Sequence, residues 1–458
     1  MWKLNINYKK WQWIVITLTF IWFIGMNIGV LKYNEMLHSL IVVGGTFSFL
    51  FLYLKKSTKS ITDISPMKYY WGIIGVFLLS FFAMAIVIKN VELPYYSDFI
   101  IAREQAIYFA NHDTISPAFS QYFHAYPFNI NTVVFLGWLY KLTGNYHYVE
   151  LITATIVNIT AIVTGLTVKN ITKNNILSLI VTISYEFYSF FCMKTYMPYT
   201  SNLVLLFPIL IMYLYTLDAP KSLRIILITI VAFIGYNIKI TALIPYIGII
   251  IVEAISSIKT KDFKNIAIAG ISCIMCFLLA SLYTSIIQKN INFTRDSSIE
   301  HNMIYYLAMG QNNESGGQYY LPIAEIGDQY RPKEERDRLF LNMALNEIRE
   351  RSMIGQVKFF VSKIAICWGE VHQDHLRFCQ FDKILLVIRH LFWYFSLLLM
   401  CIGVFYIKDK KYYAMMLGLL GVVAYLFLSE AGARYVIMYS PIVFALGAWS
   451  FISLKHKK

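Results

Sequence analysis

Three carboxylates stand in a polar segment between two long apolar runs, in the stretch PYYSDFIIAREQAIYFANHD (94–113): Asp98, Glu104 and Asp113. A carboxylate held in a fixed place can accept the proton of a hydroxyl group as a general base. Asp98 also suits a helix start after Ser97, where an Asp side chain caps backbone N–H groups and contributes about 1 kcal/mol. The two roles are compatible, because a capping carboxylate is itself held in place.

Isolated basic residues occur at other boundaries of the apolar runs. Lys239 lies between two runs in GYNIKITALIPY, and Arg434 follows Glu430 by four residues in SEAGARYVIMYS. A boundary lysine can simply extend its ammonium group into water, and Glu and Arg four apart on a helix form a local ion pair. Each cation can equally hold a phosphate group at the membrane surface, and charged residues at such positions are functional candidates.

The composition assigns these residues to a membrane protein. Of 458 residues, 58% are hydrophobic and 14% are charged, against about 25% charged residues in soluble domains. The net charge of +14 does not indicate nucleic-acid binding, because the basic residues lie in short loops between apolar runs. The chain has no P-loop or dinucleotide fingerprint, so we expect any chemistry on the outer face.

Apolar runs long enough to cross a bilayer predict an all-α polytopic membrane protein with about twelve transmembrane helices. The predicted spans are 11–31, 37–54, 69–88, 148–168, 176–193, 201–217, 224–238, 240–256, 265–287, 384–407, 412–429 and 435–454.

The positive charges orient these spans. With both termini in the cytoplasm, Lys and Arg gather in the inner segments, whereas the short outer loops hold only Lys32, Lys194, Lys239 and Arg434. Counting 126–144 as a further span would reverse this asymmetry, so we expect an interfacial helix there.

Five regions follow from this topology. Three helices in 1–88 precede an outer segment at 89–147, six helices fill 148–287, a second outer segment spans 288–383, and three helices occupy 384–458. In the second outer segment we expect an amphipathic helix, a break at Gly355 and a second helix. A disulfide between Cys367 and Cys379 of that segment is one open alternative. The spacing of His372, Asp374 and His375 fits a structural zinc site poorly.

The arrangement resembles the polyprenol-dependent glycosyltransferases of the GT-C fold, the superfamily of glycosyltransferase family 39, the protein O-mannosyltransferases and the aminoarabinose transferases. The resemblance lies in an acidic residue heading a helix in the first large outer segment, a Tyr-Pro segment and LGWLYKLTG after it, and YNIKITALIPYIGI and EAGARYVIMYSPIVFALGAW further on. It is similar to the bacterial members that decorate envelope polymers.

The resemblance implies an inverting enzyme that moves one sugar from a polyprenyl-phosphate carrier to an envelope acceptor on the outer face. It implies a carboxylate base, for which we expect Asp98, then Asp113, then Glu104. It also implies cations for the leaving phosphate, for which we expect Lys239, Arg434 and His301. We expect Tyr126, Asn129 and His124 near the acceptor.

The remaining expectations concern the partners and the alternatives. The donor carrier is expected to be undecaprenyl phosphate in a bacterial plasma membrane, and the acceptor is a polymer, lipid or protein. No cofactor is implied with certainty, and a divalent metal, Mg or Mn, stays open. A polysaccharide polymerase or ligase, and a lipid-linked sugar transporter or flippase, are alternatives. Glu186 is an acid inside a predicted span. It bears on the transporter alternative, because ionisable residues within the membrane often mark transport pathways.

Overall fold

The computed structural model describes residues 8–56, 63–329, 331–369 and 382–455. Every element in these ranges is helical. His372, Asp374, His375 and Cys379 lie outside the described residues, so the sequence hypotheses about a metal site and a disulfide at these positions are not addressed by the structure.

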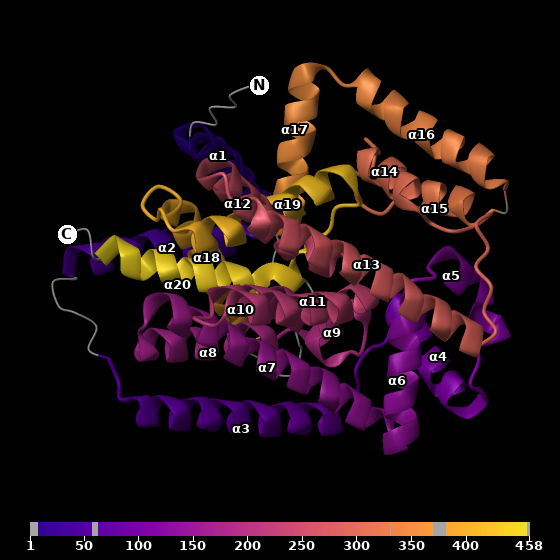
Figure 1. Ribbon diagram of the computed structural model, residues 1–458, viewed down its shortest axis with the longest axis horizontal. Helices are drawn as coiled ribbons and strands as arrows, with labels where there is room; N and C mark the ends of the chain where they lie inside the picture. Colours follow the sequence, from indigo (N-terminus) through magenta and orange to yellow (C-terminus); the bar gives the residue numbers. More distant parts are fainter. Residues whose placement is uncertain (1–7, 57–62, 330, 370–381, 456–458) are drawn as a thin grey trace.

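Twelve helices overlap the twelve predicted spans, and they run mainly along one direction (Figure 1). They are α1 (Tyr8–Tyr33), α2 (Met36–Lys56), α3 (Pro66–Asn90), α7 (Tyr146–Thr172), α8 (Asn175–Phe190), α10 (Leu206–Thr216), α11 (Lys221–Ile238), α12 (Ile244–Thr260), α13 (Lys264–Asn290), α18 (Asp382–Gly403), α19 (Lys410–Leu428) and α20 (Ser440–Lys455).

Among the described residues, eight helical stretches are long and apolar enough to cross a membrane. They are Trp11–Lys32, Pro66–Asn90, Tyr146–Thr172, Ile240–Thr260, Ile266–Asn290, Lys383–Gly403, Lys410–Leu428 and Ala433–Leu454. The apolar stretches Met36–Leu50, Thr200–Thr216 and Ser222–Ile238 are shorter, and α8 has only 16 residues. The prediction of an all-helical membrane protein is therefore confirmed, whereas the count of twelve spans stays a prediction.

Ion pairs gather the Lys-rich connections at one end of the bundle. Asp218, between α10 and α11, lies 3.1 Å from Lys173 and 3.9 Å from Lys411. Lys410 lies 3.4 Å from Glu253 near the end of α12. The start of α3 and the end of α20 lie at this same end (Figure 1). The alternating direction of the helices thus collects basic residues on one side, as the positive-inside rule requires of a cytoplasmic face.

The remaining helices lie mainly at the opposite end of the bundle (Figure 1). In the first outer segment they are α4 (Asp98–His112), η1 (Pro117–Phe119), α5 (Ser120–Ala125) and α6 (Asn129–Thr143). Between α8 and α10, and between α11 and α12, lie η2 (Met193–Tyr196), α9 (Thr200–Leu203) and η3 (Ile240–Leu243). In the second outer segment, and in the connection before α20, they are α14 (Met303–Gln311), α15 (Leu321–Gly327), α16 (Lys333–Glu350), α17 (Met353–Ile364), η4 (Ala365–Gly369), η5 (Ala433–Tyr435) and η6 (Ile437–Tyr439).

The structure refines two expectations for these segments. Helix α6, within the predicted interfacial stretch, runs across the direction of the long helices (Figure 1) and is not among the eight long apolar stretches. The break in the second outer segment falls at Arg351 and Ser352 and not at Gly355. Ser352 caps α17 by accepting a hydrogen bond from the backbone N–H of Gly355, and this hydroxyl cap fixes the helix start.

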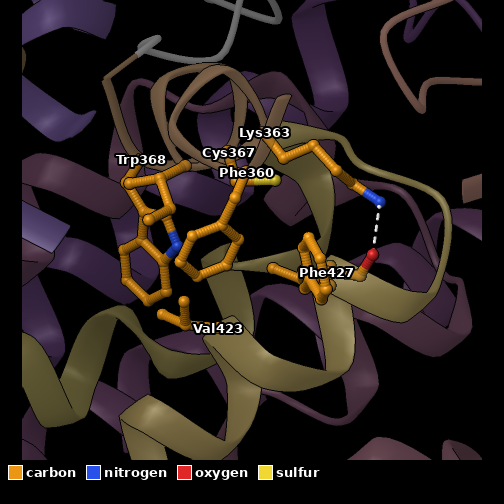
Figure 2. A pocket seen from close by; sticks show the side chains of 8 residues that line it. Phe360, Lys363, Cys367, Trp368, Val423 and Phe427 are labelled. Carbon is orange, nitrogen blue, oxygen red and sulfur yellow. Dashed lines mark hydrogen bonds between the residues drawn. The ribbon is translucent and has the colours of Figure 1, made fainter. Parts of the chain in front are cut away.

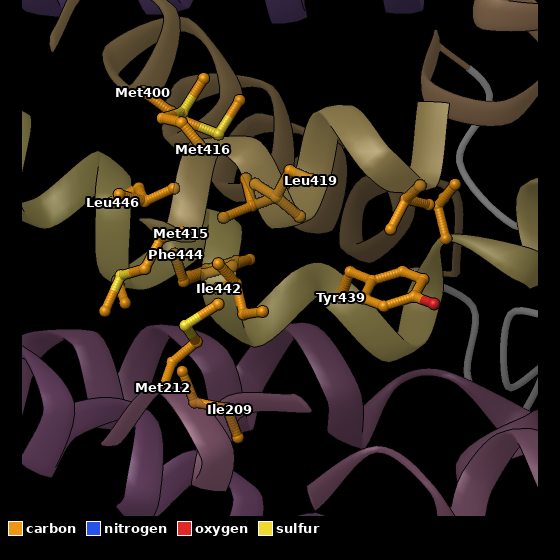
Figure 3. Packing of buried hydrophobic residues seen from close by; sticks show 14 of the residues in the cluster. Ile209, Met212, Met400, Met415, Met416, Leu419, Tyr439, Ile442, Phe444 and Leu446 are labelled. Atoms are coloured by element: carbon orange, nitrogen blue, oxygen red, sulfur yellow. The ribbon is translucent and has the colours of Figure 1, made fainter. Parts of the chain in front are cut away.

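The apolar core lies where α10, α12, α18, α19 and α20 meet. Met212 of α10, Met400 of α18, Met415 of α19 and Leu446 of α20 are fully buried in one cluster (Figure 3). Methionine side chains fill irregular gaps between helices. This packing fixes the ends of α19 and α20, between which Glu430 and Arg434 lie.

Candidate functional site

Asp98 is the first residue of α4, and its carboxylate is half-buried. The Tyr199 hydroxyl donates a hydrogen bond to Asp98 Oδ2 at 3.2 Å. The predicted capping role is wrong, because Ser97 occupies the N-cap position and no side chain caps this helix. Ser97 has φ 48° and ψ −131°, and such a conformation in a residue other than glycine is costly and is often found at functional sites.

A chain of side-chain donors ends at this carboxylate. Asn129 Nδ2 donates to the Tyr122 hydroxyl at 2.8 Å, and Tyr122 is hydrogen-bonded to Tyr199. Burial raises the pKa of Tyr199, Asp98 raises it further, and Arg434 opposes the increase. The phenols therefore stay protonated at neutral pH, and they hold Asp98 Oδ2 in place.

Lys239 reaches the same cluster from the extended residue that links α11 to η3. Burial lowers the pKa of Lys239, and the positive charge of Arg434 lowers it further. The carboxylates of Asp98 and Glu430 oppose this decrease, and the resulting pKa is about 8. Its Nζ lies 5.3 Å from the centroid of the Tyr435 ring. Since the described residues give Nζ no hydrogen bond or ion pair, the ammonium group is available to an anion.

Glu430 and Arg434 complete the cluster from the connection between α19 and α20. Arg434 Nη2 lies 3.5 Å from Glu430 Oε1 and donates to the Tyr435 hydroxyl at 2.7 Å. The predicted ion pair is present, although a loop and the short η5, and not one helix, separate its partners. Burial raises the pKa of Glu430, and Arg434 opposes this increase. The Arg434 side chain is 43% exposed, so the guanidinium can still meet a ligand.

These contacts, with the electrostatic effect of Asp98 on Lys239, define the Asp98 cluster, which consists of Asp98, Tyr122, Asn129, Tyr199, Lys239, Glu430, Arg434 and Tyr435. Its members come from α4, α5, α6 and three connections, which lie at the end of the bundle opposite the Lys-rich connections. The cluster combines a positioned carboxylate with two cations, and it can bind an anionic group beside a proton acceptor.

Aromatic side chains extend the cluster toward the second outer segment. The His301 ring stacks on Tyr305 with centroids 3.8 Å apart and meets the edge of Tyr126 at 4.7 Å. Burial raises the pKa of Tyr126, and Tyr305 and then Asp98 add to the increase. Burial lowers the pKa of His301 to about 4. This pKa favours the neutral imidazole at pH 7, and the part of His301 in binding phosphate stays a prediction.

Close packing of α4 on α6 places Asp98 and Asn129 at the same end of two neighbouring helices. A Cβ atom added to Gly137 of α6 would lie 2.5 Å from a ring carbon of Phe109 and 2.9 Å from the carbonyl oxygen of Ala106. Only glycine permits this approach. The pair of helices thus acts as one rigid support for the carboxylate.

A buried lysine holds the connection that carries Glu430. Lys363 Nζ donates to the carbonyl oxygens of Gly310, Phe427 and Ser429 at 2.7, 3.0 and 2.6 Å, and Figure 2 shows the bond to Phe427. Three acceptors match the three N–H groups of an ammonium. Lys363 therefore joins α14, α17 and the end of α19. The apolar side chains beside it leave a cavity of about 10 Å³, which is too small for a ligand.

Three predicted residues lie away from the cluster. Asp113 ends α4 in a left-handed conformation and pairs with Lys141 at 3.0 Å; fifteen residues of helix separate it from Asp98 by about 22 Å. Glu104 is exposed on α4. The His124 ring stacks on Phe293 with centroids 4.7 Å apart. None of the three has a described contact with the carboxylate of Asp98.

Tyr122 and Tyr199 are site residues that only the structure reveals. Each is one of 34 tyrosines, and neither stands in a charged motif. Glu430 was recognised only as the partner of Arg434.

No group of three or more His, Cys, Asp or Glu side chains that could hold a metal ion occurs within the described ranges. Glu430, which acts on Lys239 together with Asp98, is paired with Arg434. Because Mg²⁺ and Mn²⁺ prefer several oxygen ligands, we derive no step through a metal.

The fold and the long apolar helices define an α-helical integral membrane protein. The family described as "conserved hypothetical integral membrane protein" matches residues 11–366, and the chain belongs to this family. The match includes Asp98 and Lys239 and ends before Glu430. No curated protein and no solved structure matches the chain.

Proposed function

We propose that this protein is an inverting glycosyltransferase of the bacterial plasma membrane. It moves a single sugar from a polyprenyl-phosphate carrier, undecaprenyl phosphate, to an envelope acceptor on the outer face. One observation supports this most strongly. The end of the bundle that holds Asp98 on Tyr199 also holds Lys239 and Arg434 at the same Tyr435 side chain, and the charges of all three act on one another.

Asp98 is the general base of the proposed reaction. Tyr199 occupies Oδ2, and the described residues give Oδ1 no hydrogen bond. Oδ1 accepts the proton of the acceptor hydroxyl while the hydroxyl oxygen bonds to the anomeric carbon. A positioned base of this kind contributes about 10² to 10⁴-fold to a rate.

Lys239 and Arg434 receive the leaving group. As the new bond forms, the bond from the anomeric carbon to the phosphate oxygen breaks, and its electron pair stays on the phosphate. Attack from the face opposite the phosphate inverts the anomeric centre. Fixed cations stabilise the charge that develops on the phosphate oxygen, and the proton passes from Asp98 to water afterwards.

The lipid part of the donor fits the position of the cluster. Lys239 lies directly between Lys221–Ile238 and the apolar stretch Ile240–Thr260, so a phosphate bound there can keep its polyprenyl chain in the bilayer. Twelve spans with both termini in the cytoplasm belong to this proposal. They place the Asp98 cluster outside, because the Lys-rich connections lie at the opposite end.

A transfer assay tests the proposal. Membranes containing the protein are given undecaprenyl-phosphate monosaccharides with a labelled sugar, and label on acceptor material is measured. We expect transfer that releases undecaprenyl phosphate. Transfer only from diphosphate-linked oligosaccharides would contradict the proposal and indicate a polymerase or ligase. Movement of the intact lipid-linked sugar across vesicles would indicate a transporter.

A further inference from the structure

A second cationic site lies in the second outer segment, apart from the Asp98 cluster. A cavity of about 260 Å³ is lined by Arg295, Ser297, Glu300, Asn302, Lys333 and Arg336. This volume accommodates a phosphate group with part of the molecule that carries it, and each of the six lining residues has a polar or charged side chain.

Arg336 is a deeply buried cation among the residues that line this cavity. The residue is 1% exposed, and its two terminal nitrogens have no hydrogen-bond partner among the described residues. A buried guanidinium without acceptors is costly, and burial lowers the pKa of Arg336 while Asp337, Glu300 and Asp296 oppose this decrease. An anion in the cavity would supply the missing acceptors.

The acids near Arg336 are engaged elsewhere. Asp337 accepts a hydrogen bond from Asn302 at 2.6 Å and lies 4.0 Å from the Arg336 guanidinium, at the limit of an ion pair. Glu300 pairs with Arg295. Asp296 accepts from the backbone N–H of Ser298 at 2.8 Å.

Lys333 provides a second cation at the cavity. It is exposed at the start of α16, and the described residues give its ammonium group no partner. Arg336 and Lys333 both line the cavity, and guanidinium and ammonium groups are the donors with which proteins bind phosphate.

The cavity adjoins the Asp98 cluster through His301. Arg336 lowers the pKa of His301, after the larger effect of burial. The His301 backbone N–H donates to the carbonyl oxygen of Ala125 at 2.9 Å, and its ring contacts Tyr126. His301 thus lies in sequence between the cavity residues Glu300 and Asn302 and contacts Tyr126, which meets Tyr122 of the Asp98 cluster with ring centroids 5.0 Å apart.

We propose that the Arg336 cavity binds a phosphate group carried by the sugar acceptor. The assignment to the acceptor rests on the proposed function, whereas phosphate binding itself does not. The acceptor would then be a phosphate-bearing envelope molecule, bound by Arg336 and Lys333 while its hydroxyl group reaches Asp98.

Direct binding of labelled orthophosphate tests the site without measuring sugar transfer. The full chain is reconstituted in phosphatidylcholine nanodiscs as the Lys239→Gln/Arg434→Gln variant, which removes the cations of the Asp98 cluster. We expect saturable binding of phosphate that Arg336→Gln weakens at least about tenfold. Lys333→Gln, a change at an exposed residue that does not threaten folding, is expected to weaken it about threefold.

Arg338→Gln is the matched control, because Arg338 is exposed on the same helix and does not line the cavity. It should leave phosphate binding within twofold. Absence of saturable binding, or binding unchanged in both Arg336→Gln and Lys333→Gln, overturns the proposal. Failure of sugar transfer with phosphate binding intact would overturn only the proposed function.

Competition identifies the carrier of the phosphate. Soluble glycerol 3-phosphate should displace orthophosphate from the cavity, as expected for an acceptor that approaches from water. Displacement by phosphatidylglycerol placed in the nanodisc, without displacement by glycerol 3-phosphate, would assign the cavity to a lipid headgroup and overturn the acceptor assignment.

Discussion

The Tyr199 hydroxyl donates to Asp98 Oδ2 at 3.2 Å, across 101 residues of sequence. Tyr199 itself is hydrogen-bonded to Tyr122. This relationship orients the carboxylate and leaves Oδ1 for a substrate.

Tyr199→Phe should slow sugar transfer about tenfold, because a hydrogen bond to a charged group contributes about 1.5–3 kcal/mol. The change removes only the hydroxyl, so folding should persist. Initial transfer rates at saturating donor measure the effect. Tyr148→Phe, at an exposed position on α7, is the control. Equal rates for the two variants would show that Tyr199 does not position the base.

The pH dependence of transfer should report Lys239. Burial lowers the pKa of this lysine to about 8, so the ammonium is charged below pH 8 and neutral above it. We expect kcat/KM to fall as the pH rises through about 8, because a neutral amine no longer holds phosphate. In Lys239→Arg the guanidinium stays charged, and the decrease near pH 8 should disappear. A decrease that persists in Lys239→Arg would assign the titration to another group.

Arg434→Gln should lower kcat about a hundredfold, as expected for removing a group that stabilises transition-state charge. Arg434→Lys keeps a charge but loses the fork that contacts both Glu430 and Tyr435, so its rate should fall between those of Arg434→Gln and wild type. Arg349→Gln, at an exposed position on α16, is the control. Wild-type kcat in Arg434→Gln would exclude the leaving-group role.

Lys363→Met should destabilise the protein by about 2–4 kcal/mol, because three buried carbonyl groups would lose their donor. Thermal unfolding of the purified protein in detergent measures the change, and the midpoint should fall. Lys358→Met alters an exposed lysine on the same helix and should leave the midpoint within about 1 °C. Equal midpoints for the two variants would mean that Lys363 does not hold the α19 connection.

Much of the architecture was accessible from the sequence, because bilayer thickness and the positive-inside rule constrain apolar runs and lysines strongly. The Lys173–Asp218–Lys411 contacts join connections that the charge pattern had already placed on one side. Lys239 and Arg434 stand out in the sequence because the short outer loops hold few basic residues, and Asp98 stands out because it heads a helix in the first outer segment.

The remaining site residues depend on tertiary structure. Tyr122 and Tyr199 are neutral and common in this chain, so only their convergence on Asp98 distinguishes them. Asp113 has the same side chain as Asp98 in the same outer segment, and residue type could not separate them. The structure separates them, because Asp98 begins α4 whereas Asp113 lies at the other end of this helix beside Lys141.

Sugar transfer by Asp98→Asn, compared with Asp113→Asn, tests the central claim most directly. Asparagine keeps the shape of the side chain and can accept from Tyr199, but it cannot take a proton. With both proteins inserted and folded equally, Asp98→Asn should transfer sugar from the undecaprenyl-phosphate donor at least about a hundredfold more slowly than wild type, and Asp113→Asn within about twofold of it. Full transfer by Asp98→Asn, or loss of transfer in Asp113→Asn alone, would contradict the assignment of Asp98 as the base.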